Sequence, residues 1–252
     1  MSAGGVSAAS PVTWRWPGYC RPRTSPARRW RWRRDRPARG PVLLHFHGGG
    51  FYSGNKAREA RPLIRHMTSR HGFVCVSANY RLQPHVTLAD QVADVRAAIA
   101  WVRAHAAEYD AEPDALFVAG SSAGANLAVR AACAEEAGIA GLICRYGYYG
   151  GLAPHGDLPP MLVLHGQNDM QIPPTAVRAF VERVRAVSSH PVSYGELPGA
   201  HHDFDLFESI RSAAVNQAVE QFAAAVRSRN PATPGRPGTN VRLDGGGSLG
   251  AS

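Results

Sequence analysis

The hydrophobic positions along this chain of 252 residues fall into two patterns that alternate over most of its length. Short, almost continuous apolar runs predict strands that are buried on both faces of a sheet. Stretches whose apolar residues recur at intervals of three and four, such as Val92, Val95, Ile99 and Val102, predict amphipathic helices. The predicted strands are residues 41–46, 72–78, 115–119, 141–146, 161–165 and 192–197, and the predicted helices are residues 56–71, 88–107, 122–137, 174–187 and 208–227.

This alternation of strand and helix places the chain in the α/β class, with a doubly wound, mostly parallel sheet. It extends over residues 41–228, which we expect to form one domain with a full core. Residues 1–40 precede it as an arm rich in Arg, Trp and Pro, and their alternating Trp and Arg residues predict an irregular hairpin at the sheet edge. Residues 229–252 are rich in Pro and Gly and are predicted to form a disordered tail.

The formal net charge of +9 is confined to the arm, because residues 1–40 contain ten arginines and one acid, Asp35. The remaining 18 basic and 18 acidic residues cancel, so the α/β domain is close to neutral. We expect no nucleic-acid partner. A weak electrostatic contact of the arm with a membrane surface is the alternative that its arginines leave open, and the sequence leaves the oligomeric state open.

The cysteine pattern and the hydropathy of the chain predict a cytoplasmic protein. Cys20, Cys75, Cys133 and Cys144 are scattered without a C-x-x-C pair, which argues against a disulfide framework and against a cysteine zinc site. The sequence contains no apolar run of about 18 residues, the length typical of a membrane-spanning helix. Its start lacks the basic segment and long apolar stretch of a secretory signal.

A G-x-S-x-G motif lies between the predicted strand 115–119 and the helix that follows it. In serine hydrolases this motif forms a sharp turn that exposes the serine, which predicts Ser122 as a nucleophile. The backbone N–H of Ala123, the next residue, is then available to an oxyanion. The alternative is a glycine-rich turn of another α/β protein, such as a phosphate-binding loop.

A second glycine-rich segment reads HGGGF and directly follows the first predicted strand. Without side chains, its backbone can approach a ligand closely, and consecutive N–H groups can converge on one oxygen. We assign the N–H groups of Gly49 and Gly50, together with that of Ala123, as oxyanion donors. His47 and Gly48 have supporting positions, with His47 expected to brace the loop through a hydrogen bond.

The order of the remaining polar residues matches a nucleophile, acid and histidine arrangement. Asp169 follows the predicted strand 161–165, and His202 lies in a loop after the last predicted strand. The order Ser122, Asp169, His202 is the one expected for a catalytic triad on an α/β-hydrolase sheet. The weaker candidates are His201 for the base and Glu196, Asp203 and Asp205 for the acid.

A metal site is the competing interpretation of the histidines. Its ligands would be His45, His47, Asp169, His201 and His202. This interpretation does not explain the two glycine-rich motifs, so we expect neither a metal nor an organic cofactor.

Taken together, these motifs resemble the hormone-sensitive-lipase-like esterases of the α/β-hydrolase superfamily. The segments that carry the resemblance are HGGGF from His47, NYRL from Asn79, GSSAG from Gly120 and PGAHHDFD from Pro198. The family's H-x-F pattern falls on His202, which favours it over His201. The resemblance implies a serine carboxylic-ester hydrolase that acts on small esters of short-to-medium acyl chains through an acyl-enzyme. Alternatives are an arylformamidase, an acetyl-sugar esterase or a non-catalytic ligand-binding protein on the same scaffold.

The chain departs from that family pattern in two ways. Ser121 stands directly before the nucleophile, where the family usually has an acid. The segment between the predicted strands 141–146 and 161–165 is too short to contain part of the usual cap, and the N-terminal cap helices are replaced by the arm. The resemblance therefore implies an α/β-hydrolase fold with a reduced cap and an open site.

Overall fold

The computed structural model describes residues 40–57, 59–133 and 138–229. By its contacts the chain divides into residues Met1–Arg36 and Pro37–Ser252, and every described residue belongs to the second unit. Of the predicted arm (residues 1–40) and the predicted tail (residues 229–252), only the inner ends are described: Gly40 begins a strand and Arg229 ends a helix, which moves both boundaries by one residue. Residues 1–39 and 230–252 lie outside the described residues, so their assignments stay predictions.

Six parallel strands form the sheet, in the order β2-β1-β3-β4-β5-β6. The order reverses direction after β2, as expected when a sheet is wound both ways from one starting strand. The predicted doubly wound α/β architecture is therefore confirmed. The strands are β1 (Gly40–Phe46), β2 (Val74–Ala78), β3 (Ala111–Ser121), β4 (Gly141–Arg145), β5 (Met161–Gly166) and β6 (Val192–Leu197).

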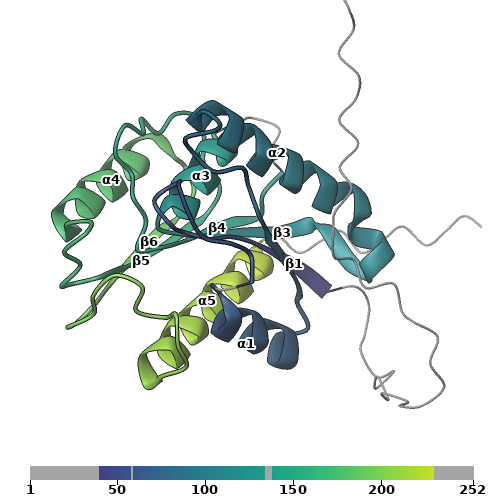
Figure 1. Ribbon diagram of the computed structural model, residues 1–252. Helices are drawn as coiled ribbons and strands as arrows, with labels where there is room; N and C mark the ends of the chain where they lie inside the picture. Colours follow the sequence, from purple (N-terminus) through teal and green to yellow (C-terminus); the bar gives the residue numbers. More distant parts are fainter. Residues whose placement is uncertain (1–39, 58, 134–137, 230–252) are drawn as a thin grey trace, which may run out of the picture. The chain divides into compact units, whose positions relative to one another are not determined.

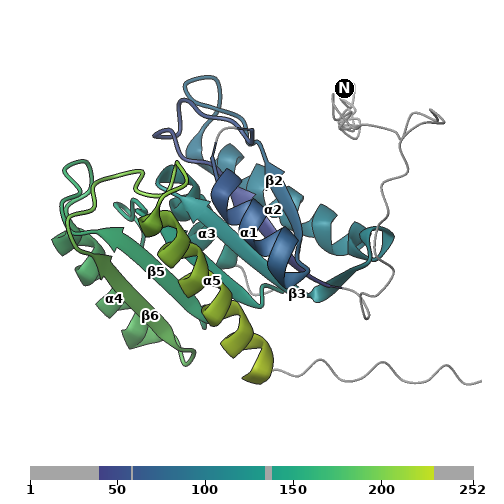
Figure 2. The same ribbon diagram turned by 90° about the horizontal axis from the view of Figure 1, so that it is seen from below.

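Helices cover both faces of this sheet. Its α-helices are α1 (Arg61–His71), α2 (Leu88–His105), α3 (Ala123–Ala132), α4 (Pro174–Val187) and α5 (Ile210–Arg229). Figure 1 shows α2, α3 and α4 on one face and α1 and α5 on the other. In Figure 2 the second face is turned toward the viewer, and α1 and α5 lie side by side along it.

The alternation of side chains along each strand divides the core in two. Leu44 and Val118 point to the cluster under α2, α3 and α4, whereas their neighbours Leu43 and Phe117 point to the cluster under α1 and α5. All four are fully buried. Burial on both faces is the reason that these strands are continuous apolar runs in the sequence.

Several predicted boundaries were wrong by a few residues. The helix predicted from residue 56 begins at Arg61, because Ala60 adopts a left-handed conformation and Pro62 occupies the first turn, where a missing N–H costs nothing. The helix predicted over 88–107 ends at His105 and continues as a 3₁₀ turn, Ala106–Tyr109. The helix predicted over 122–137 ends at Ala132.

The segment from residue 146 to residue 160, between β4 and β5, contains no helix, as predicted from its length. Nor is any helix among the described residues long and apolar enough to cross a membrane.

Candidate active site

Ser122 lies on a strained turn between a strand and a helix. β3 ends at Ser121 and α3 begins at Ala123, while Ser122 itself has φ 50° and ψ −117°. A non-glycine residue in such a conformation costs on the order of 1–3 kcal/mol and is found mainly at functional sites. A Cβ on Gly120 would overlap the Gly124 carbonyl, and one on Gly124 would overlap the Phe46 carbonyl. The turn therefore needs both glycines of the G-x-S-x-G motif.

The structure brings Ser122, His202 and Asp169 into one chain of hydrogen bonds. His202 Nε2 lies 3.1 Å from Ser122 Oγ, and its Nδ1 lies 2.7 Å from Asp169 Oδ2. Asp169 is buried, and its other oxygen accepts hydrogen bonds of 2.9 Å from the N–H groups of Gln171 and Ile172. This oxygen is thus fixed by backbone donors, which leaves Oδ2 directed at the imidazole.

The weaker candidates have other partners. His201 is exposed, with its Nδ1 2.9 Å from the carbonyl oxygen of Asn168. Glu196 forms an ion pair with Arg178, and Asp205 forms one with Arg145. Asp203 Oδ1 comes no closer than 3.9 Å to His202 Nε2, and burial raises the pKa of its carboxyl.

The HGGGF loop lies directly against the turn that carries Ser122. A Cβ on Gly48 would lie 3.0 Å from the Cβ of Ser122. Gly49 has φ 106°, which is open to glycine but not to other residues, and an added Cβ would overlap the Ser53 carbonyl. The close approach of the loop to the nucleophile therefore depends on Gly48 and Gly49.

The backbone N–H groups near this turn differ in whether they have a hydrogen-bond partner. The N–H of Gly48 donates to Glu59 Oε2 at 2.7 Å, which assigns that group to loop support. Within the described parts of the chain, the N–H groups of Gly49, Gly50 and Ala123 have no hydrogen-bond acceptor. No sequence motif pointed to Glu59, which lies in the turn before α1. Burial raises the pKa of its carboxyl.

His47 supports the HGGGF loop through a hydrogen bond and ring stacking. Its Nδ1 donates to the Gly48 carbonyl at 2.7 Å, and its ring stacks on Tyr80 with centroids 4.4 Å apart. Tyr80 OH in turn donates to the His47 carbonyl at 2.8 Å. Burial lowers the pKa of His47, which favours the neutral imidazole.

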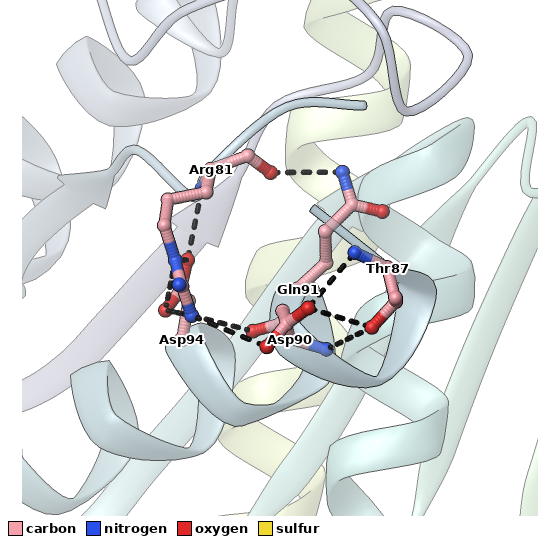
Figure 3. A network of polar contacts seen from close by, with 5 residues as sticks. All are labelled: Arg81, Thr87, Asp90, Gln91 and Asp94. Atoms are coloured by element: carbon pink, nitrogen blue, oxygen red, sulfur yellow. Dashed lines mark hydrogen bonds and ion pairs between the residues drawn. The ribbon is translucent and has the colours of Figure 1, made fainter. Parts of the chain in front are cut away.

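Figure 3 shows a polar network at the start of α2, and its residue Gln91 also reaches the end of the HGGGF loop. The side chain of Gln91 is buried and donates to the carbonyls of Phe51 and Arg81, at 2.9 and 2.8 Å. Arg81 pairs with Asp94 through its backbone N–H and its guanidinium. Thr87 and Asp90 form a capping box that starts the helix under Gln91. The NYRL motif thus connects the HGGGF loop to α2.

A buried ion pair fixes the loop that carries His202. Arg145, at the end of β4, pairs with Asp205, three residues after His202, and both are at most 2% exposed. Arg145 Nη2 also donates to Ser121 Oγ at 2.9 Å and lies 2.9 Å from His45 Nε2. Ser121, unusual before the nucleophile, thus accepts from a buried guanidinium. Sequence reasoning treated Asp205 only as a weak candidate acid and missed Arg145.

The five side chains of the alternative metal interpretation do not gather around one point. His45 belongs to the Arg145 network, and His201 points to the Asn168 carbonyl. Of the residues that the structure describes, the three that are close enough to share an ion are His66, His71 and Glu220, between α1 and α5. A cavity of about 710 Å³ lies away from the candidate site. It is lined in part by Cys133, His155, Asp157 and Phe222 and includes none of the residues around Ser122.

Comparison with known proteins agrees with this geometry. The family model BD-FAE matches residues 33–145. From Mycobacterium tuberculosis, the probable carboxylic ester hydrolase LipM is 36% identical over 77% of this chain and 57% of its own length. Esterase LipQ from the same organism is 33% identical over 79% and 59%. This chain thus spans less than two thirds of these curated relatives.

Among solved structures, butyrate-bound esterase Est2 of Thermogutta terrifontis matches with a TM-score of 0.66 and 26% identity, over 75% of this chain and 84% of that one. The same enzyme phosphoramylated by tabun matches with a TM-score of 0.65 and 27% identity, again over 75% and 84%. With the parallel sheet and the turn at Ser122, these matches show that the chain has the α/β-hydrolase fold, and the named relatives and structures that it resembles are esterases of that superfamily.

Proposed function

We propose that this protein is a serine carboxylic-ester hydrolase that acts on small esters of short-to-medium acyl chains. The observation that carries the proposal is the relay through His202, which is within hydrogen-bond reach of both Ser122 Oγ and Asp169 Oδ2. A nucleophile, a base and a group that orients the base, in mutual contact, are the minimal equipment for acyl transfer.

In the first half of the reaction, Ser122 Oγ attacks the ester carbonyl carbon while His202 Nε2 takes the hydroxyl proton. The resulting oxyanion accepts hydrogen bonds from the N–H groups of Gly49, Gly50 and Ala123. The carbon–oxygen bond to the alcohol then breaks, and His202 Nε2 returns the proton to the leaving oxygen. The acyl group remains on Ser122.

In the second half, His202 Nε2 takes a proton from water, which attacks the acyl-enzyme carbonyl. The tetrahedral intermediate collapses, Ser122 Oγ leaves with the proton from His202, and the carboxylic acid is released. Asp169 holds the imidazole with its proton on Nδ1, so that Nε2 has a free lone pair, and it stabilises the imidazolium in both halves. No step requires a metal or an organic cofactor.

One comparison supports the proposed range of short-to-medium acyl chains. The Thermogutta terrifontis esterase was solved with butyrate and with propionate bound, at 26–27% identity to this chain.

The test is hydrolysis of p-nitrophenyl acetate, butyrate and decanoate by the purified chain and by Ser122→Ala. We expect turnover of the two shorter esters, a lower kcat/KM for the decanoate and no turnover by the variant. The matched control is Ser228→Ala, an exposed serine near the end of α5, which should retain wild-type rates. A folded wild type without turnover would favour a ligand-binding protein on the same scaffold, and equal turnover by Ser122→Ala would exclude Ser122 as the nucleophile.

A further inference from the structure

Three side chains with metal-binding atoms converge between the two helices that cover one face of the sheet. His66 and His71 come from α1, and Glu220 comes from α5. Each histidine Nε2 lies 3.0 Å from the same Glu220 oxygen, Oε2, and the three ligand atoms all lie within 4.8 Å of one another. α1 and α5 are in contact along this face, as Figure 2 shows.

Hydrogen bonding alone leaves this cluster incomplete. Glu220 Oε2 forms a hydrogen bond with His66 Nε2. His71 Nε2 is as close to the same oxygen, yet it is buried and has no hydrogen-bond partner in the described parts of the chain. Buried polar atoms in proteins are rarely left without a partner, and an orphaned one often marks an ion or water that belongs there.

We propose that His66, His71 and Glu220 bind a divalent transition-metal ion, of which Zn²⁺ is the best fit. Two imidazole nitrogens and one carboxylate oxygen form the ligand set that zinc takes where a fourth position is left to water. Zinc–ligand bonds of about 2.0–2.2 Å at tetrahedral angles separate neighbouring ligand atoms by about 3.3–3.5 Å. The two nitrogen–oxygen separations of 3.0 Å are within a few tenths of an ångström of that value.

The chemistry of the three ligands also selects the class of ion. Mg²⁺ and Ca²⁺ prefer shells of oxygen ligands, whereas imidazole suits zinc, nickel and copper. Binding requires neutral imidazoles with the proton on Nδ1, so that each Nε2 directs a lone pair at the ion. All three side chains retain some exposure, between 18 and 32%, which gives the ion a path from solvent.

The ion would join α1 to α5, and each of these helices directly follows a loop of the active site. α1 begins two residues after Glu59, which holds the HGGGF loop, and α5 begins five residues after Asp205, which holds the His202 loop. None of the three ligands belongs to the Ser122 relay. The expected role is therefore structural, and the proposal is independent of ester hydrolysis.

The test uses the untagged full chain, stripped with EDTA, dialysed and titrated with Zn²⁺ by calorimetry, with bound zinc counted by elemental analysis. We expect one Zn²⁺ per chain and a rise in Tm of about 5–10 °C at a hundredfold excess over Kd, reversed by EDTA. Co²⁺ in place of Zn²⁺ should give the intense visible absorption of a tetrahedral site.

The variants His71→Gln and Glu220→Gln should each lose both the stoichiometric binding and the rise in Tm. The exposed histidines His155 and His190 provide the control, since His155→Gln and His190→Gln should bind as the wild type does. If one ligand variant fails to fold, the other carries the comparison, with circular dichroism of the metal-free form as the check. Absence of binding by the wild type, or equal binding by the folded ligand variants, would overturn the proposal.

Discussion

Removing the charge of Asp205 should destabilise the protein far more than removing a surface charge. Arg145 and Asp205 are 1% and 2% exposed, so Asp205→Asn leaves a guanidinium buried without its partner. Breaking a buried pair in this way costs about 3–5 kcal/mol. For a domain of this size the loss corresponds to a fall in Tm of roughly 6–20 °C.

The other neighbours of Arg145 offer it little compensation. Ser121 is uncharged, and burial, followed by the nearby Arg145 charge, lowers the pKa of His45 well below its usual value, so that its imidazole is neutral. Glu59 is the remaining nearby acid, and burial raises its pKa. The charge of Asp205 is therefore the main counterion of the buried guanidinium.

The assay is urea unfolding followed by circular dichroism, with Arg178→Met as the control. Arg178 pairs with Glu196 at the surface, and an exposed pair contributes at most about 1 kcal/mol. Replacing both buried partners, as Arg145→Met with Asp205→Leu, should recover most of the stability, because no uncompensated charge remains. If Asp205→Asn unfolds within 1 kcal/mol of the wild type, the ion pair does not hold the His202 loop and the reasoning fails.

Three further outcomes follow from the geometry. Asp169→Asn should fold normally, judged by its Tm, and lose about 10⁴ in kcat for p-nitrophenyl butyrate, because the amide no longer fixes the imidazole tautomer; an unimpaired variant would refute that role. Gly124→Ala should destabilise the protein in urea, because its methyl group would overlap the Phe46 carbonyl, whereas Gly156→Ala, at an open position, should cost only the strain of its φ of 71°. Because burial lowers the pKa of His45 and His47, the unfolded chain binds more protons as the pH falls through about 6.5. Stability should then decline from that pH downward, and His45→Gln, compared by thermal melts from pH 8 to 5, should flatten the decline if it folds.

The central strands could be predicted because strands such as β1, β4 and β5 are buried on both faces. A short, nearly continuous apolar run such as residues 41–46 lacks the alternating polar face of an amphipathic helix and therefore predicts a strand. The observed strand β1 agrees with this prediction within one residue. The start of α1 could not be placed from periodicity. It depends on the left-handed Ala60 and on Pro62, and the apolar pattern is insensitive to both.

The positions of Ser122, Asp169 and His202 could be proposed because each follows a strand at the same edge of the sheet. Their supporting contacts could not be predicted from the sequence. Arg145 and Asp205 are 60 residues apart, and Gly48 and Glu59 are 11 residues apart, so that their contact depends on how the segment between them folds. Nothing in local composition links such pairs. The cytoplasmic location, the basic arm and the catalytic roles stay predictions.

The most direct measurement of the central claim is covalent labelling with a fluorophosphonate, with the modified residue located by mass spectrometry of the digested protein. If His202 activates Ser122, one label per chain should appear on the peptide that contains Ser122, and His202→Gln should slow the labelling by orders of magnitude while Ser228→Ala leaves it unchanged. A folded wild type that takes up no label, or takes it up on another residue, would contradict the account.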